Sequence, residues 1–148
     1  MLTKRPERMA EEVACQIQAL LKIGGFNNLW LGVTVCNPDE LWKIDVLGQI
    51  PAAHRWVSFE PLLKATALHL SVKHGQIIDW GVVGCESGVS RRFCNTEWIH
   101  DFVDVFEHIN KPLFVKQMEV NGKVVHDLKD MPEWAMQDLA NSKTLRKE

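Results

Sequence analysis

The chain has 148 residues, of which 46% are hydrophobic and 24% charged, and its formal net charge at pH 7 is −2. This composition is ordinary for a globular protein, the length favours one domain, and the small charge gives no reason to expect binding to a phosphate backbone. No stretch approaches the ~20 apolar residues that cross a bilayer, and the amino terminus has no secretory pattern. The four cysteines form no CxxC pair, which is typical of a cytoplasmic protein with free thiols.

The first half of the chain predicts helices and strands in alternation. Gly24-Gly25 ends a helix whose apolar residues recur at helical spacing. Asn37-Pro38 combines a capping asparagine with a proline at the first helical position. The elements predicted in this half are a helix over 3–23, a strand over 29–35, a helix from 37 to about 47 and a strand over 55–60.

The second half leaves one segment open between two interpretations. Residues 62–76 are either a short strand, in which Leu68, Leu70 and Val72 alternate with polar residues, or a loop with one helical turn. Asn121-Gly122 is typical of a two-residue hairpin turn. The remaining predicted elements are a strand over 77–83, a helix capped by Asn95 or Thr96 with the apolar face Trp98, Phe102, Val105, Phe106 and Ile109, a strand over 112–116, and a short helix opened by residues 131–134.

This order of elements predicts the class of fold. Strands that alternate with helical segments form βα units and a parallel sheet. Four strands make either half of a (β/α)₈ barrel or a small open sheet. We interpret residues 1–140 as a single α/β domain with a mostly parallel sheet, flanking helices and a C-terminal hairpin, followed by a polar tail over residues 141–148.

The stretch from Ile77 to Gly88 organises the expected site. Its apolar first half suits a strand buried on both faces, and the glycines after it let the backbone turn tightly or approach a ligand. Ligands bind where parallel strands end. The predicted strand ends carry Cys36 and Asn37, then Ser58 and Glu60, then Cys85, Glu86 and Ser87, and finally Lys116 and Gln117.

Each of these residues also has an interpretation that needs no ligand. Glu60 and Glu86 can be acids bonded to solvent or backbone, although two carboxylates do acid–base work where their environments separate their pKa values. Lys116 can be a simple ion-pair partner, and Arg91-Arg92 can be surface arginines instead of anion ligands. Cys85 is interpreted as an inert buried thiol, because no histidine lies at a strand end to serve as its base. The glycines do not spell GxGxxG, and the cysteines lack the spacing of a metal site.

Five motifs occur in order along the chain: Leu2-Thr3-Lys4-Arg5-Pro6-Glu7-Arg8-Met9, Trp30-Leu31-Gly32-Val33-Thr34-Val35, Ser58-Phe59-Glu60-Pro61-Leu62-Leu63, Trp80-Gly81-Val82-Val83-Gly84-Cys85-Glu86-Ser87-Gly88 and Phe114-Val115-Lys116-Gln117. Together they resemble the C-terminal half of a family of phage and prophage proteins of unknown function, which are similar to radical-SAM-like barrels. The resemblance covers almost the whole chain. It implies a partial (half) TIM-type barrel, with S-adenosylmethionine and an iron–sulfur cluster as cofactors of the full-length members.

One departure from the family limits what the resemblance implies. Full-length members carry a cysteine cluster in an amino-terminal half, whereas this chain starts with Met1 inside the first motif, and its cysteines are not spaced to replace the cluster ligands. We therefore expect S-adenosylmethionine as a candidate ligand, no iron–sulfur cluster on this chain alone, and no catalysis without the missing half. The expected ligand-binding residues are Lys4, Arg5, Glu60, Gly84, Glu86, Ser87, Gly88, Lys116 and Gln117.

Two functions follow as hypotheses. The first is a truncated radical-SAM-like phage protein that keeps part of a nucleotide or S-adenosylmethionine pocket and acts with a second chain in the host cytoplasm. The alternative is a small phage interaction protein that binds and modulates a host protein. A half-barrel leaves strand edges and apolar faces uncovered, so we expect a homodimer or a partner protein to cover the open edge. A non-functional remnant is a third interpretation, against which the mutually consistent caps, turns and apolar faces argue.

Overall fold

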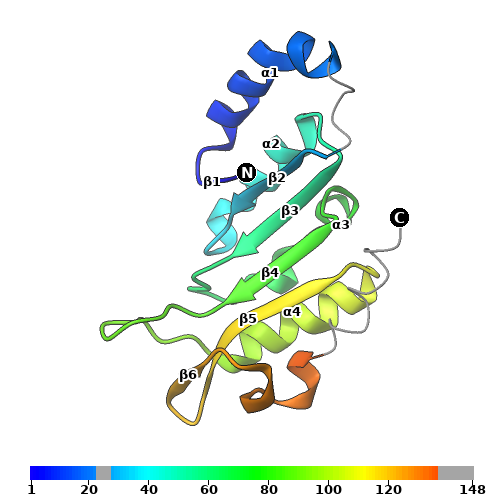
Figure 1. Cartoon of the computed structure of the whole chain (residues 1–148). Coiled ribbons are helices and arrows are strands. Elements are labelled where there is room, and N and C mark those ends of the chain that lie inside the picture. Colours follow the sequence, from blue (N-terminus) through cyan, green and yellow to red (C-terminus); the bar gives the residue numbers. More distant parts are fainter. Residues whose placement is uncertain (23–27, 137–148) are drawn as a thin grey trace.

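The computed structural model describes residues 1–22 and 28–136, along which helices and strands alternate (Figure 1). The strands are β1 (Leu2–Thr3), β2 (Trp30–Thr34), β3 (His54–Phe59), β4 (Trp80–Gly84), β5 (Leu113–Val120) and β6 (Lys123–Val125). The α-helices are α1 (Pro6–Lys22), α2 (Trp42–Gln49), α3 (Val72–Ile77) and α4 (Thr96–His108). The described residues also form the short 3-10 helices η1 (Pro38–Glu40), η2 (Ala67–His69), η3 (Leu128–Asp130) and η4 (Glu133–Met136).

The six strands form one sheet whose spatial order follows the chain, from β1 to β6. The first five are parallel, and β6 runs antiparallel to the end of β5. Asn121 and Gly122 both have positive φ, 52° and 77°, as a tight hairpin turn requires. The mixed α/β class, the mostly parallel sheet, the flanking helices and the hairpin are therefore confirmed. The sheet is not closed, because β1 and β6 lie at its two edges (Figure 1).

Several elements differ from the sequence prediction, among them the strand predicted over 112–116, which extends as β5 to Val120. β1 is an unpredicted strand, because two residues are too short to show a pattern; it forms by pairing with Gly32 and Val33 of β2. Of the two interpretations of residues 62–76, the helical one is correct, since η2 and the start of α3 lie there. The strand predicted over 77–83 begins only at Trp80, because Ile77 is the last residue of α3.

Local capping explains where these helices begin. Ser71 accepts a hydrogen bond from the His74 amide, and the His74 side chain accepts one from the Ser71 amide, which together form a capping box at the start of α3. Asn37 caps η1 and Asn95 caps α4, as the sequence predicts. The final predicted helix is a 3-10 turn, η4. Gly24-Gly25 and the polar tail over 141–148 lie outside the described residues.

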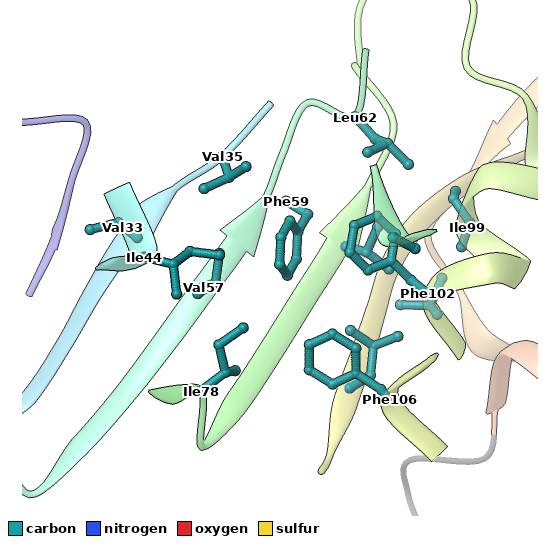
Figure 2. Close-up of a cluster of buried hydrophobic side chains, with 14 of the residues drawn as sticks. Val33, Val35, Ile44, Val57, Phe59, Leu62, Ile78, Ile99, Phe102 and Phe106 are labelled. Atoms are coloured by element: carbon teal, nitrogen blue, oxygen red, sulfur yellow. The ribbon is translucent and has the colours of Figure 1, made fainter. Parts of the chain in front are cut away.

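The main core lies between the sheet and its helices, and Figure 2 shows its centre. Phe59 of β3 packs against Phe102 of α4 with ring centroids 4.3 Å apart, and against Phe106 at 6.1 Å. Gly81 on β4 admits the Phe106 ring, since an added Cβ would lie 2.6 Å from it. The interleaved rings fix α4 against β3 and β4.

The apolar face of α4 is rotated relative to the predicted one. Its buried residues are Ile99, Phe102, Val103 and Phe106. Trp98, Val105 and Ile109, which the sequence predicts to be on this face, lie at its margin and are partly buried.

The opposite face of the sheet carries no helix among the described residues (Figure 1). Alternate residues of β2, β3 and β4 point to this face, and four of them form an aromatic cluster of Trp30, His54, Trp56 and Trp80. The Trp30 ring centroid lies 4.3 Å from that of His54 and 6.2 Å from that of Trp80, and Trp56 lies 5.5 Å from Trp80. Trp30 is 38% exposed, whereas its neighbour Leu31, on the helix side, is fully buried.

Candidate functional site

Glu60 and Lys116 meet at the carboxyl ends of the strands. Glu60 directly follows β3 and Lys116 lies in β5, so the Glu60 side chain must cross the end of β4 to reach its partner. The Lys116 Nζ is 3.0 Å from Glu60 Oε1, and the Ser58 hydroxyl donates to Glu60 Oε2 at 3.3 Å. Only 16% of the Glu60 side chain is exposed, against 53% of Lys116. The carboxylate is therefore fixed, while the ammonium remains open to solvent.

Gly84 makes this crossing feasible. A Cβ at this position would lie 2.9 Å from Glu60 Oε1 and 3.1 Å from the Gln117 Cγ. Any side chain at the end of β4 would therefore displace the carboxylate from Lys116. A glycine here serves close approach of another group, not a special backbone angle, since its φ is not positive.

The predicted residue Gln117 is committed to the backbone. Only 7% of Gln117 is exposed, and its Nε2 donates to the Cys85 carbonyl. The Cys85 amide in turn donates to the Gln117 carbonyl at 3.2 Å. These bonds hold β4 and β5 together where their register shifts between Val83 and Gly84. The amide of Gln117 thus orients the strand ends around Glu60.

The structure places Glu86 in a different interaction from Glu60. Arg92 donates to both Glu86 carboxylate oxygens at 2.7 Å, and its backbone amide donates to Glu86 Oε2 at 2.9 Å. These hydrogen bonds lower the pKa of Glu86 to about 2. Among the described residues, no hydrogen bond or ion pair joins Glu86 to Glu60 or Lys116. Glu86 and Arg92 instead clamp the loop between them, which contains Ser87 and Gly88.

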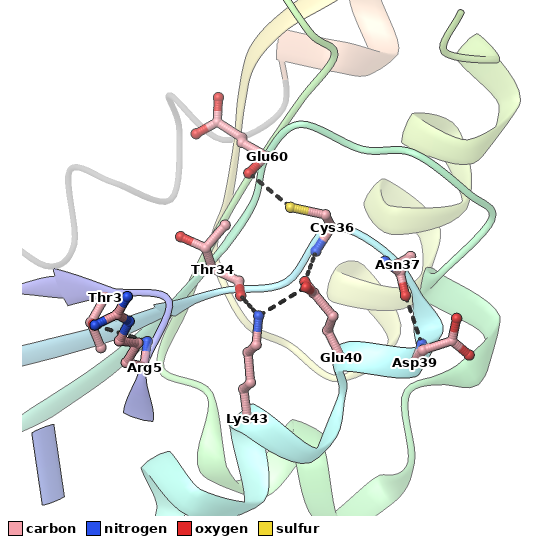
Figure 3. A network of polar contacts seen from close by, with 9 residues as sticks. All are labelled: Thr3, Arg5, Thr34, Cys36, Asn37, Asp39, Glu40, Lys43 and Glu60. Atoms are coloured by element: carbon pink, nitrogen blue, oxygen red, sulfur yellow. Dashed lines mark hydrogen bonds and ion pairs between the residues drawn. The ribbon is translucent and has the colours of Figure 1, made fainter. Parts of the chain in front are cut away.

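A second polar network supports the end of β2, and Figure 3 shows it. The Cys36 amide donates to Glu40 Oε2 at 2.7 Å, and the Lys43 Nζ lies 3.0 Å from Glu40 Oε1. Lys43 also donates to the Thr34 carbonyl at 3.3 Å and has only 8% of its side chain exposed. The Cys36 thiol donates to the Glu60 carbonyl at 3.4 Å, which links this network to the first.

Sequence reasoning missed Glu40 and Lys43. The available signal was their spacing: they follow the Asn37 cap and stand three residues apart, as helical ion pairs do. Burial would raise the pKa of Glu40, but the Cys36 amide and the Lys43 ammonium outweigh it, so the pKa lies below its usual value. Glu40 is therefore a structural anion that tethers η1 and α2 to the strand end.

Lys4 approaches the same end of the sheet from β1. Burial raises the pKa of the Cys36 thiol, and the nearby Glu40 carboxylate raises it further. The positive charges of Lys4, Lys43 and Arg92 oppose that rise. The Arg5 amide donates to the Thr3 hydroxyl at 3.0 Å, so this bond fixes the backbone just after β1.

Three of the thiols are buried, and two cavities of the described residues lie away from the strand-end charges. Cys36, Cys85 and Cys94 are buried, and burial raises the pKa of Cys94 to about 12. Among the cavities formed by the described residues, one of about 460 Å³ lies between α3 and α4, and one of about 480 Å³ lies beside the β5–β6 hairpin. Neither is lined by Glu60 or Lys116. At the strand ends, the Lys116 side chain is 53% exposed, so it is accessible from solvent.

The fold and the site define a class: an open, mostly parallel α/β sheet with charged groups gathered at the carboxyl ends of its strands. The model of a protein family, described as a protein of unknown function (DUF5131), matches residues 1–142 of the chain. The chain belongs to this family. No curated protein and no solved structure matches it. Within residues 1–22 and 28–136, no helix has the length and apolar character to cross a membrane.

Proposed function

We propose that this chain supplies one side of a nucleotide- or S-adenosylmethionine-type ligand site and acts with a second chain, as part of a radical-SAM-like phage protein. The observation that carries the proposal is the Glu60–Lys116 pair, held across Gly84 at the carboxyl ends of β3 to β5. This is the edge of a parallel sheet where ligands bind.

The chemistry of the pair suits a ligand with hydroxyl, ammonium and carboxylate or phosphate groups. The Glu60 carboxylate accepts hydrogen bonds from ribose hydroxyls or from an ammonium group, and its low exposure strengthens such bonds. Lys116, half exposed, donates to a carboxylate or a phosphate. Lys4 adds a further cation, because it directly follows Thr3, which pairs with Val33 near the end of β2.

We propose no iron–sulfur cluster on the described residues of this chain. No group of three or more histidine, cysteine or acidic side chains lies together in that part of the chain. The buried thiols Cys36 and Cys85 follow different strands and are hydrogen-bonded into the fold or hold a raised pKa. The activity proposed for this chain alone is ligand binding, not catalysis.

The openness of the sheet supports the participation of a second chain. Parallel sheets are almost always covered on both faces, and here the face of the aromatic cluster is uncovered by described residues (Figure 1). A half TIM-type barrel has this property, since its inner face becomes a core only when the other strands are added.

Calorimetric titration with S-adenosylmethionine tests the ligand site. We expect the wild type to bind, and Glu60→Gln and Lys116→Met each to weaken binding about 10- to 100-fold, as for a lost hydrogen bond to a charged group. Lys73→Met is the matched control, because Lys73 forms an ion pair with Asp45 at 2.6 Å far from the strand ends. The absence of heat with the wild type, or equal weakening by the control, would overturn the proposal.

A second candidate function, a phage interaction protein that binds and modulates a host protein, has its own supporting observation. The clamped loop between Glu86 and Arg92 presents Val89 fully exposed, and Phe93 beyond it is 69% exposed. Arg91 ties the loop to the hairpin by donating to the Gly122 carbonyl at 2.8 Å. An apolar side chain on a fixed loop loses little conformational entropy when a partner buries it.

Affinity capture from host lysate tests this alternative with a surface variant. The wild type should retain a partner that Val89→Asp loses, while Val72→Asp, a change at another exposed valine on α3, should keep it. Capture of no protein, or of the same proteins by wild type and Val89→Asp, would count against the interaction function.

A further inference from the structure

The proposed ligand site does not explain the uncovered face of the sheet. The helix side of β2 and β3 holds fully buried Leu31, Val33 and Val57. The other face holds the aromatic cluster, in which the rings contact one another instead of a covering layer. Three tryptophans on an open face of a parallel sheet are unusual, because both faces of such sheets are normally buried.

The size of this face matches a protein interface. Leu2, Trp30 and Phe114 are 44%, 38% and 37% exposed, and Lys4, Lys116 and the half-buried rings of the aromatic cluster adjoin them. With aromatic side chains of ~150–250 Å² each, the face leaves on the order of 600 Å² open. A stable dimer needs about 800 Å² from each partner, and the strand edges contribute the remainder.

Both edges of the parallel part of the sheet are free among the described residues. β1 pairs only with β2. On β5, β6 pairs with Met118–Val120, so the outer edge of residues 113–117 has no strand partner. Figure 1 shows these two edges on opposite sides of the sheet. A two-fold axis along the strand direction would bring β1 of one copy beside β5 of the other, with all strands running the same way.

We infer that the occupant of this face is a second copy of the chain, which closes the two sheets into a two-fold barrel with the aromatic clusters inside. In the dimer, the carboxyl ends of the parallel strands of both copies surround one common opening. There, Lys4 of one copy lies beside the Glu60–Lys116 pair of the other, where the Glu60 carboxylate offsets the second cation. This inference deepens the proposed function by naming its second chain, but the dimer does not depend on the ligand.

Light scattering after size exclusion, without ligand, tests the dimer. At about 100 µM the wild type should have twice its 16.9 kDa monomer mass. Trp30→Glu should raise the dimer dissociation constant about a hundredfold or more, because it places an unpaired charge in the interface. Trp42→Glu is the matched control, since Trp42 is 44% exposed at the start of α2, on the helix side.

Three results would overturn the inference. The first is a wild-type monomer at this concentration, which would leave the face to a different protein. The second is a dimer that survives both Trp30→Glu and Phe114→Glu with native circular dichroism. If those variants unfold, hydrogen exchange on the wild type decides: residues 113–117 of β5 should lose protection on dilution, and unchanged protection contradicts the closed barrel. The ligand titration and the dimer measurement can fail independently of each other. Their results therefore distinguish a failure of the proposed ligand site from a failure of the proposed dimer.

Discussion

Gly32→Ala probes the packing of the aromatic cluster most sharply. An added Cβ at Gly32 would lie 2.5 Å from both Cε2 and Nε1 of Trp56, because the indole ring lies across β2 in the space of the missing side chain. The rigid Trp56 indole ring cannot move away from the added Cβ as the end of a flexible side chain could. We therefore expect overpacking to cost ~1–3 kcal/mol of unfolding free energy.

The same substitution should lose this effect when the ring is removed. In a Trp56→Ala background the Cβ has room, and alanine in a strand is favoured over glycine by ~0.5–1 kcal/mol. The double-mutant cycle should therefore show a coupling of ~1.5–4 kcal/mol. Gly75→Ala is the matched control, since its nearest contact is an ordinary 3.4 Å from Ile109.

Urea denaturation of the four proteins in the cycle measures this coupling. Thermal melting gives a second estimate, because each kcal/mol shifts Tm by about 2–4 °C in a chain of this size. Additive free energies, within ~0.5 kcal/mol, would refute the reasoning, because they would mean that Trp56 does not occupy the space above Gly32.

Three further predictions concern the charged and thiol groups. Lys43→Met should destabilise by ~1–3 kcal/mol in urea, less than for a fully buried pair because Glu40 keeps 29% of its side chain exposed; a change below ~0.5 kcal/mol would contradict the network. Because the pKa of Glu86 is lowered, its ion pair with Arg92 contributes fully above pH 4.5 and is lost as pH falls through about 2. An NMR titration of the Glu86 carboxyl should give that midpoint, and Arg92→Ala should return it toward 4.5, whereas an unchanged midpoint would exclude the clamp. A disulfide reagent at pH 8 should label exposed Cys15 rapidly and, only after unfolding, the three buried thiols, so rapid labelling of a second thiol would contradict the burial of Cys36, Cys85 and Cys94.

The elements with strong local signals were predictable from the sequence. The Asn37 and Asn95 caps and the Asn121-Gly122 turn each rest on contacts within a few residues, so the sequence contains their cause. The stretch Leu29–Val35, rich in β-branched residues, predicted β2, which lies inside the sheet between β1 and β3. The convergence of Glu60 and Lys116 was predictable from topology, since parallel strands end at one edge; their role with a ligand stays a prediction.

The remaining features depend on partners that are distant in the sequence or that compete locally. β1 exists only through its pairing with β2, and Ile77 joins α3 because the Ser71 capping box starts a helix that reaches it. The sequence could not show that Arg92 turns back to hold Glu86, nor that Lys43 folds inward onto Thr34 and Glu40. Each of these side chains could instead be solvated. The position of the folded backbone determines which partner it contacts.

Amide chemical-shift mapping with S-adenosylmethionine tests the central claim most directly, because it locates the ligand as well as detecting it. We predict that the perturbed amides cluster at the carboxyl ends of the strands, around Gly84, Lys116 and the start of the chain at Lys4. Perturbations confined to the cavity beside Leu68 and Val72, or none at saturating ligand, would contradict a ligand site at the Glu60–Lys116 pair.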